Sequence, residues 1–280
     1  MENNSGSAII DEQESIQSSM KYNTGLVLSG GAARGFAHLG VFKALREKGI
    51  TAGIVSGVSA GAIAGAFYCD GFEPEEVLEL FNNTKIFRFV KLEFNKQGLM
   101  NISGLTRVLK NNLRTKSIED LRKPLVITIT NLMEGTTRYI TQGDLVNAVV
   151  ASSSIPVIFK PVIIDGDAYI DGGIKNNLPI EPIQGLCRNL IGVHVNPVGM
   201  YNPEKGLIHL ALRSFHLSVA SGIPGKVKQL TCFIEPSGLA KYSYYDIEGR
   251  YKMFDLGYEE AMKVLAKTGF RSPAEKIQLT

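Results

Sequence analysis

The sequence predicts an α/β fold with a wound, mostly parallel sheet, and three observations favour it. Short apolar segments alternate with segments of helical periodicity. The first two apolar segments both end at glycine-rich turns that open a helix. No repeat or low-complexity block divides the 280 residues, which are enough to bury a large core. We expect one folded domain over 23–271, with a polar, disordered tail at 1–22 and a short tail at 272–280.

The first half of the chain predicts two strand–helix units and then further helices. The first helical segment stops at Gly49, and the second strand runs straight into a serine turn. Pro74 suits the first turn of a later helix. We expect strands at 24–31 and 51–57, helices at 36–49, 60–71, 74–84 and 104–113, and an irregular, basic and aromatic stretch at 85–100.

The second half predicts alternating strands and helices with one hairpin. Pro156 ends a helix, and an Asp-Gly-Asp turn joins the two short strands of the hairpin. Tyr169 stands where a calcium loop needs its third ligand, so we interpret Asp165 and Asp167 as turn residues. We expect strands at 123–135, 136–141, 190–197 and 230–236, the hairpin at 161–173, and helices at 144–156, 206–222 and 245–269.

Composition limits the partners and the compartment. A net charge of +3 does not indicate nucleic-acid binding. Cys69, Cys187 and Cys232 are far apart and form no paired motif, so we expect reduced thiols, no metal, no cofactor and a cytoplasmic location. Neither a secretory pattern nor a run of about 18 apolar residues occurs, so any membrane contact is expected to be peripheral. Oligomeric state leaves no signal in the sequence.

The stretch GVSAGAIAGAF places Ser59 between Gly57 and Gly61, after an apolar strand and before a helix. This is the setting of a nucleophile elbow, in which the glycines permit a tight turn. The helix N-terminus would favour negative charge beside the serine. The structural alternative makes Ser59 an N-cap and Gly61 a packing residue.

A second glycine-rich loop, SGGAARG over 29–35, follows the first strand and also opens a helix. Its consecutive N–H groups can bind an anion, either a phosphate or the oxyanion of a tetrahedral intermediate. The dinucleotide fingerprint fails because Ala32 replaces a glycine, and no P-loop lysine follows. Arg34 could support the loop or attract an anionic head group; a helix-end salt bridge is the alternative.

A serine nucleophile needs a base, and the four histidines are poorly placed for that role. His38 is expected inside a helix, His194 inside a strand, and His209 and His216 on one apolar helix, all as packed or surface residues. Asp171 instead ends a strand in AYIDGG. An aspartate with an ordinary pKa is a weak base, so contact with the serine and a preorganised oxyanion site must supply much of the rate.

Four motifs in order resemble the patatin-like phospholipase family, most closely its bacterial members near the neuropathy-target-esterase branch. They are a strand ending in GGAARG, the G-x-S-x-G elbow, ASSSIPVIFKPV and DGG, within a resemblance that covers about residues 24–270. The resemblance implies a three-layer α/β/α sandwich. It also implies hydrolysis of acyl esters of phospholipids, lysophospholipids or related lipids, through a Ser–Asp dyad and an acyl-enzyme.

The resemblance assigns roles residue by residue. Ser59 becomes the nucleophile and Asp171 the base, with Gly172 and Gly173 in the base loop. The oxyanion loop comprises Gly30, Gly31, Ala32, Arg34 and Gly35. The family often has glycine at the position of Ala32; alanine keeps the N–H donor but costs roughly 1–2 kcal/mol if its φ is positive.

Two other functions stay open from the sequence. The first is an α/β-hydrolase esterase with a Ser-His-Asp triad, which would place a late histidine on a loop. The second is a catalytically silent lipid-binding relative, which the intact Ser59 and Asp171 argue against.

The segment 85–100 suggests how a lipid surface could be contacted. Four basic residues stand among aromatic and aliphatic ones, an arrangement that binds anionic bilayers. The alternative is that the apolar residues join the core and the cations form a solvated face.

Overall fold

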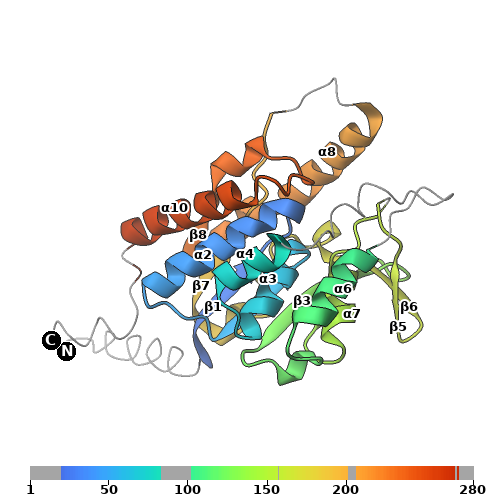
Figure 1. Ribbon diagram of the computed structural model, residues 1–280, viewed down its shortest axis with the longest axis horizontal. Coiled ribbons are helices and arrows are strands. Elements are labelled where there is room, and N and C mark those ends of the chain that lie inside the picture. The colour runs from blue at the N-terminus through green and yellow to red at the C-terminus, as the bar shows by residue number, and fades with distance from the viewer. Residues whose placement is uncertain (1–19, 83–101, 157, 201–205, 269, 271–280) are drawn as a thin grey trace, which may run out of the picture.

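The computed structural model describes residues 20–82, 102–156, 158–200, 206–268 and 270, without the side chains at 82, 206–209, 211, 212 and 215. The whole basic segment 85–100, the whole tail 272–280 and residues 1–19 of the first tail therefore lie outside the described residues. The described part forms an α/β fold around a mostly parallel sheet, as predicted (Figure 1).

Eight strands form one sheet in the described residues, in the order β5-β6-β3-β2-β1-β7-β8, with β4 paired to β3. The five neighbours from β3 to β8 are parallel, whereas β4 and β6 run antiparallel to β3. The strands are β1 (Tyr22–Leu28), β2 (Ile54–Val58), β3 (Leu125–Asn131), β4 (Thr136–Ile140), β5 (Val162–Ile164), β6 (Asp167–Asp171), β7 (Cys187–Val193) and β8 (Cys232–Ile234).

Helices connect the parallel strands, because a parallel pair requires a crossover. The α-helices are α2 (Phe36–Glu47), α3 (Ala60–Cys69), α4 (Pro74–Asn82), α6 (Ser103–Asn112), α7 (Leu145–Ser152), α8 (Gly206–Ala220), α9 (Ile223–Val227) and α10 (Arg250–Thr268). Short 3-10 turns are η1 (Ala32–Gly35), η2 (Ile118–Asp120), η3 (Gly172–Ile174), η4 (Gln184–Leu186) and η6 (Ser237–Lys241).

Apolar side chains cover both faces of the sheet. Along β1, Leu26 and Leu28 belong to the large cluster formed with α2, α3, α7 and α10. Val27 points to the opposite face, because side chains alternate along a strand. There it packs in a smaller cluster with the coil residues 178–183 and with Ile223 of α9. The second outer layer is thus thinner than the first.

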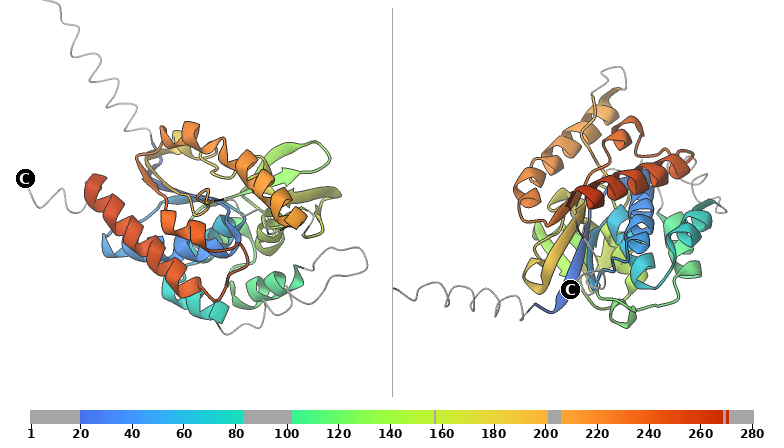
Figure 2. Two further views of the ribbon diagram at one scale, coloured as in Figure 1. Left: turned by 90° about the horizontal axis from the view of Figure 1, so that it is seen from above. Right: turned by 90° about the vertical axis from the view of Figure 1, so that its left-hand side faces the viewer.

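The helices α2 and α10 lie side by side over the larger cluster (Figure 2). Gly40 and Gly257 permit this close approach, since a Cβ on either would overlap the backbone of the other helix.

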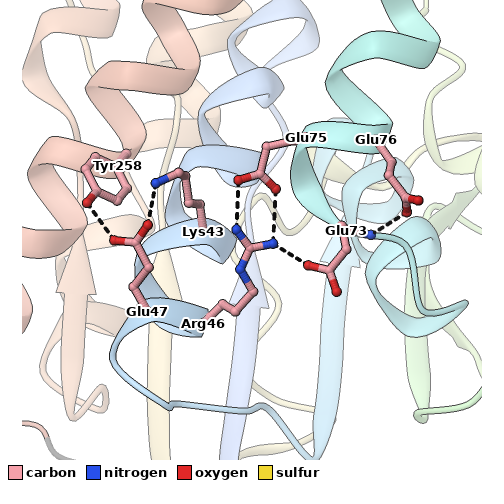
Figure 3. A network of polar contacts seen from close by, with 7 residues as sticks. All are labelled: Lys43, Arg46, Glu47, Glu73, Glu75, Glu76 and Tyr258. Atoms are coloured by element: carbon pink, nitrogen blue, oxygen red, sulfur yellow. Dashed lines mark hydrogen bonds and ion pairs between the residues drawn. The ribbon is translucent and has the colours of Figure 1, made fainter.

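At the exposed rim of this helix pair, Glu47 is bonded to Lys43 and to the Tyr258 hydroxyl (Figure 3). Arg46 pairs with Glu73 and Glu75 near the start of α4. Exposed pairs of this kind stabilise little, so the apolar contact holds the helices together.

Several expected boundaries differ from the structure. The helix expected to end at Pro156 ends at Ser152, and the strand expected at 190–197 spans Cys187–Val193. The C-terminal helix begins at Arg250 rather than near 245, because Tyr242 and Tyr244 bond to the loop after β1 through their carbonyl oxygens. His194 lies directly after β7 rather than inside a strand. The three cysteines are buried and unpaired.

The strand register brings three loops to one edge of the sheet. Leu28 pairs with Gly57, Val58 pairs with Thr128, and Ile129 pairs with Asp171. The loop after β1, the turn after β2 and the loop after β6 are therefore neighbours, although 143 residues separate Leu28 from Asp171 in sequence. This edge is where α/β sheets place their ligand sites.

Candidate active site

Ser59 occupies a strained turn between β2 and α3. Its φ of 53° and ψ of −120° are unusual for a residue with a side chain, and such strain persists where the surroundings hold it. A Cβ at Gly57 would lie 2.6 Å from the Gly61 carbonyl oxygen, and one at Gly61 would overlap the Leu28 carbonyl. The glycines are thus required by close approach within the turn and to β1. Ser59 directly precedes the first turn of α3.

Asp171 is the last residue of β6 and lies beside Ser59. Its carboxylate accepts the Gly173 N–H at 2.7 Å, and the Ser59 hydroxyl lies close enough to influence its pKa. The residue is buried, with 5% of its surface exposed. Burial raises the pKa of Asp171 to about 6, although the Ser59 hydroxyl and the Gly173 N–H both act to lower it. A Cβ at Gly172 would overlap the Thr128 carbonyl, so glycine is needed for the chain to pass β3 there.

The loop after β1 has some N–H groups engaged and others free. The Gly30 N–H donates to Asn177 Oδ1 at 3.0 Å, and the Ala33 N–H donates to the Tyr244 carbonyl at 3.1 Å. Within the described residues, the N–H groups of Gly31 and Ala32 have no hydrogen-bond partner, and both residues line the cavity beside Ser59. The φ of Ala32 is 50°, which is the strained conformation anticipated for an alanine at this position.

Arg34 anchors this loop from behind. Its guanidinium donates to the Tyr242 carbonyl at 2.8 and 3.0 Å and to Asn196 Oδ1 at 2.7 Å. It also lies 4.5 Å from the centre of the Tyr244 ring. No carboxylate pairs with Arg34 in the described part of the chain, so the helix-end salt bridge is not formed there. Burial lowers the pKa of Arg34. Gly35 packs closely against Ala60 of α3.

A cavity of about 60 Å³ lies over Ser59 and Asp171. One water molecule needs roughly 10–15 Å³ of such a cavity, so this space holds a few water-sized groups, such as an ester group and a few methylenes, rather than a whole lipid. The remainder of a lipid would extend outside it. The lining residues are Gly30, Gly31, Ala32, Ser59, Ile155, Ile158, Asp171, Gly173, Asn177, Asn196, His216, Val219, Tyr244 and Tyr245.

His216 is buried, as expected, but it lines this cavity, which its helical pattern does not reveal. Its Nε2 lies 2.9 Å from the Asn196 carbonyl, so Nε2 carries a proton and donates. Nδ1 is then the acceptor for the Tyr244 hydroxyl at 2.7 Å. Both ring nitrogens are engaged, and burial lowers the pKa of His216.

The other histidines do not line the cavity where they are described. His38 Nε2 bonds to the Ser29 carbonyl at 2.9 Å, and His194 Nδ1 bonds to Glu235 at 2.6 Å. His209 lies in α8, and its side chain is outside the described residues.

Asn177 and Tyr244 are site residues that the sequence pattern missed. Asn177 bonds across 147 residues to Gly30, and Tyr244 bonds across 28 residues to His216. Asn177 stands in the run KNNLP shortly after DGG, which is the only local signal for it. Tyr244 has no signal beyond a tyrosine pair.

Comparisons with known proteins place this site in context. Residues 26–183 match the family described as patatin-like phospholipase. An uncharacterized NTE family protein of Mycobacterium tuberculosis is 30% identical over 184 residues, which cover 65% of this chain and 51% of that protein. The lysophospholipase nte1 of Aspergillus fumigatus is 31% identical over 191 residues, covering 64% of this chain and 12% of that protein.

The fold has a counterpart among solved structures. The crystal structure of VipD from Legionella pneumophila superposes with a TM-score of 0.52 at 16% identity, over 89% of this chain and 67% of VipD. The chain spans about half the length of the mycobacterial relative and about an eighth of the fungal one.

Proposed function

We propose, because the chain belongs to the patatin-like phospholipase family, that it is a serine hydrolase of carboxylic esters in phospholipids, lysophospholipids or related lipids. The observation that carries this proposal is that Ser59 and the buried Asp171 line one cavity, with the Ser59 hydroxyl close enough to the Asp171 carboxyl group to lower its pKa. The lysophospholipase name of the fungal relative supports the same substrate class.

In the proposed mechanism, Asp171 takes the proton of the Ser59 hydroxyl while Oγ attacks the ester carbonyl carbon. The negative charge that develops on the carbonyl oxygen is stabilised by the free N–H groups of Gly31 and Ala32. Asp171 then passes its proton to the departing alcohol, which leaves an acyl group on Ser59. Water, deprotonated by Asp171, attacks the acyl-enzyme and releases the fatty acid and the free serine.

Histidine is not needed in this proposal. His216 is the described histidine at the cavity, and both of its nitrogens are engaged by Asn196 and Tyr244. It would have to break one of these bonds to accept a proton from Ser59. The Ser-His-Asp alternative therefore requires the loss of a His216 hydrogen bond, which the Ser–Asp dyad does not require.

A labelled fluorophosphonate probe tests the dyad, because it reacts with an activated serine. Ser59→Ala and Asp171→Asn should both abolish labelling and hydrolysis of a short soluble ester, since the two residues act as a unit. Asp165→Asn is the matched control: it makes the same change in the same hairpin, at a position with φ of 51° that asparagine tolerates. It should be labelled like the wild type.

Three outcomes would contradict the dyad. Labelling that survives Ser59→Ala would place the nucleophile elsewhere. A folded His216→Gln variant without labelling would favour the triad. Wild-type protein that is neither labelled nor active on any ester would favour the silent lipid-binding relative.

We also propose that the chain meets its lipid at a membrane surface, next to α8. Within the described residues, no helix is long and apolar enough to cross a bilayer. On α8, Leu210 and Leu217 are 44% and 47% exposed and stand seven residues apart, so they lie on the same side of the helix. His216 and Val219 of α8 line the cavity, and no acidic residue occurs between 206 and 234. Figure 1 shows α8 extending outward past the α2–α10 pair.

A further inference from the structure

The motif ASSSIP, residues 151–156, takes no part in the proposed mechanism, yet it lies against both proposed catalytic residues. It contains the C-terminal end of α7, and its serines Ser152, Ser153 and Ser154 are all buried. A buried hydroxyl needs hydrogen-bond partners, so the partners of each serine show what it holds in place.

Ser152 bridges the backbones of two strand ends. Its Oγ accepts the Ser59 N–H at 2.8 Å and donates to the Thr128 carbonyl at 2.7 Å. A hydroxyl has one proton, so donation to Thr128 orients a lone pair toward Ser59. The N–H that Ser152 holds belongs to the residue with the strained φ of 53°.

Ser154 makes a similar hydrogen bond to Asp171, the proposed base, through its main-chain carbonyl. Its carbonyl accepts the Asp171 N–H at 3.0 Å. The hydroxyls of Ser153 and Ser154 instead bond one turn back in α7, to Val149 and Val150, each at 2.8 Å. Of the three hydroxyls, that of Ser152 alone reaches the elbow.

These bonds have two consequences for the elbow. Ser59 follows β2, Asp171 ends β6, and β3 lies between these two strands. The segment 152–154 is hydrogen-bonded to Ser59, to Thr128 of β3 and to Asp171. The Ser59 N–H is also occupied, so it does not compete with the free donors of Gly31 and Ala32 for a developing oxyanion. Without Ser152 Oγ, a buried N–H would lose its partner, and the strained turn could relax toward another acceptor.

We propose that Ser152 is a positioning residue, which fixes the backbone of Ser59 so that its hydroxyl faces Asp171. The effect of Ser152 on catalysis rests on the proposed function, whereas its effect on the Ser59 N–H does not. We predict that removing the Ser152 hydroxyl lowers the reactivity of Ser59, whereas removing the neighbouring Ser153 hydroxyl does not.

Ser152→Ala and Ser153→Ala form the matched test, because each deletes one buried hydroxyl from consecutive positions. Ser152→Ala should react with the fluorophosphonate probe at least tenfold more slowly than Ser153→Ala. On a short soluble ester, kcat should fall by a similar factor while KM stays within about twofold, since the cavity is intact. Amide hydrogen exchange at Ser59 should be at least tenfold faster in Ser152→Ala than in Ser153→Ala.

Equal labelling rates and equal Ser59 exchange in the two variants would overturn the proposal. If Ser152→Ala does not fold, the pair Ser152→Cys and Ser153→Cys replaces it, because a thiol is similar in size and a weak acceptor. The same difference is then expected, and its absence has the same meaning. Unlabelled wild-type protein would contradict the proposed function instead, and exchange at Ser59 would still decide the positioning role.

Discussion

Asp171 differs from an ordinary aspartate through its surroundings. It is buried, and no cation pairs with it in the described part of the chain. The ionised form therefore loses hydration that the Gly173 N–H and the Ser59 hydroxyl only partly replace, which raises its pKa to about 6. A pKa closer to neutrality makes a carboxylate a better general base while leaving it ionised above pH 6. Burial thus supplies some of the basicity that a histidine would otherwise provide.

The raised pKa of Asp171 has a cost in stability, which Asp171→Asn should remove. The folded-state pKa of about 6 exceeds the ordinary value of 3.8, so the folded chain loses stability as pH rises through this interval. About two pKa units correspond to about 3 kcal/mol. Above pH 7, Asp171→Asn should therefore raise the free energy of unfolding by up to about 3 kcal/mol, and the gain should vanish below pH 4.

Urea unfolding of both proteins at pH 8, 6 and 4 measures this difference. Asp165→Asn serves as the control, because that residue lies at an exposed turn and should show no such gain. An Asp171→Asn variant that is less stable than the wild type at pH 8 would contradict the prediction. In the wild type, the rate of probe labelling should rise with pH around 6, since only the ionised carboxylate accepts a proton.

At the scale of elements, the contact between α2 and α10 closes the main core over the sheet. It depends on two glycines rather than on the ion pairs at its rim, because Gly40 and Gly257 let the helix backbones touch. The polar network in Figure 3 joins the exposed edges of α2, α4 and α10. Its Lys43 and Arg46 contacts are exposed, where solvent weakens charge interactions.

Gly257→Ala should destabilise the fold by about 1–3 kcal/mol, despite the better helix propensity of alanine. A Cβ at Gly257 would overlap the Ala37 carbonyl, which is backbone and cannot move aside alone. Gly225→Ala is the control, because nothing lies within 4 Å of a Cβ at that helical glycine. Thermal denaturation distinguishes them; equal melting temperatures would show that α2 and α10 separate without cost.

At the scale of the molecule, α8 lies beside the active-site edge of the sheet, because His216 and Val219 of α8 line the same cavity as Ser59 and Asp171. The cavity is too small for a whole lipid. Tyr245, which lines it, and Leu217, which follows the lining residue His216, are both about half exposed. If the protein surface around the cavity contacts the membrane, a lipid can stay in its bilayer and insert only its ester group into the cavity. The segment 85–100, for which the sequence suggested membrane contact, lies entirely outside the described residues, and that contact stays a hypothesis.

Leu210→Ser with Leu217→Ser should lower turnover of phospholipid vesicles several-fold, since each exposed leucine would otherwise bury apolar area in the bilayer. Hydrolysis of a short soluble ester should change by less than twofold. Leu186→Ser is the control: that leucine is 39% exposed but precedes β7, at the opposite edge of the sheet. Equal losses on vesicles and soluble ester would show that the α8 leucines act on the fold rather than on membrane contact.

The sequence alone determined the features that depend on neighbours along the chain. The G-x-S-x-G turn, the aspartate at a strand end before two glycines, and the hairpin around Asp165 all appear where their local patterns predict them. Ala32 has the positive φ that was raised as a condition, because the family that the sequence resembles often has glycine at its position. Strand and helix periodicity also predicted the class of fold, because the alternation of buried side chains is itself a local property.

Only the tertiary structure decided which of these groups meet and which remain free. Asn177 occupies the Gly30 N–H, so Gly31 and Ala32 are left as the free donors at the cavity within the described residues. His216 reaches the cavity although its helix looks merely apolar in sequence, and Tyr244 then engages it. The Gly30–Asn177 pairing joins residues 147 positions apart, which the order of the strands in the sheet brings together. Local propensity carries no information on contacts at that separation, because their free energy comes from packing the whole sheet.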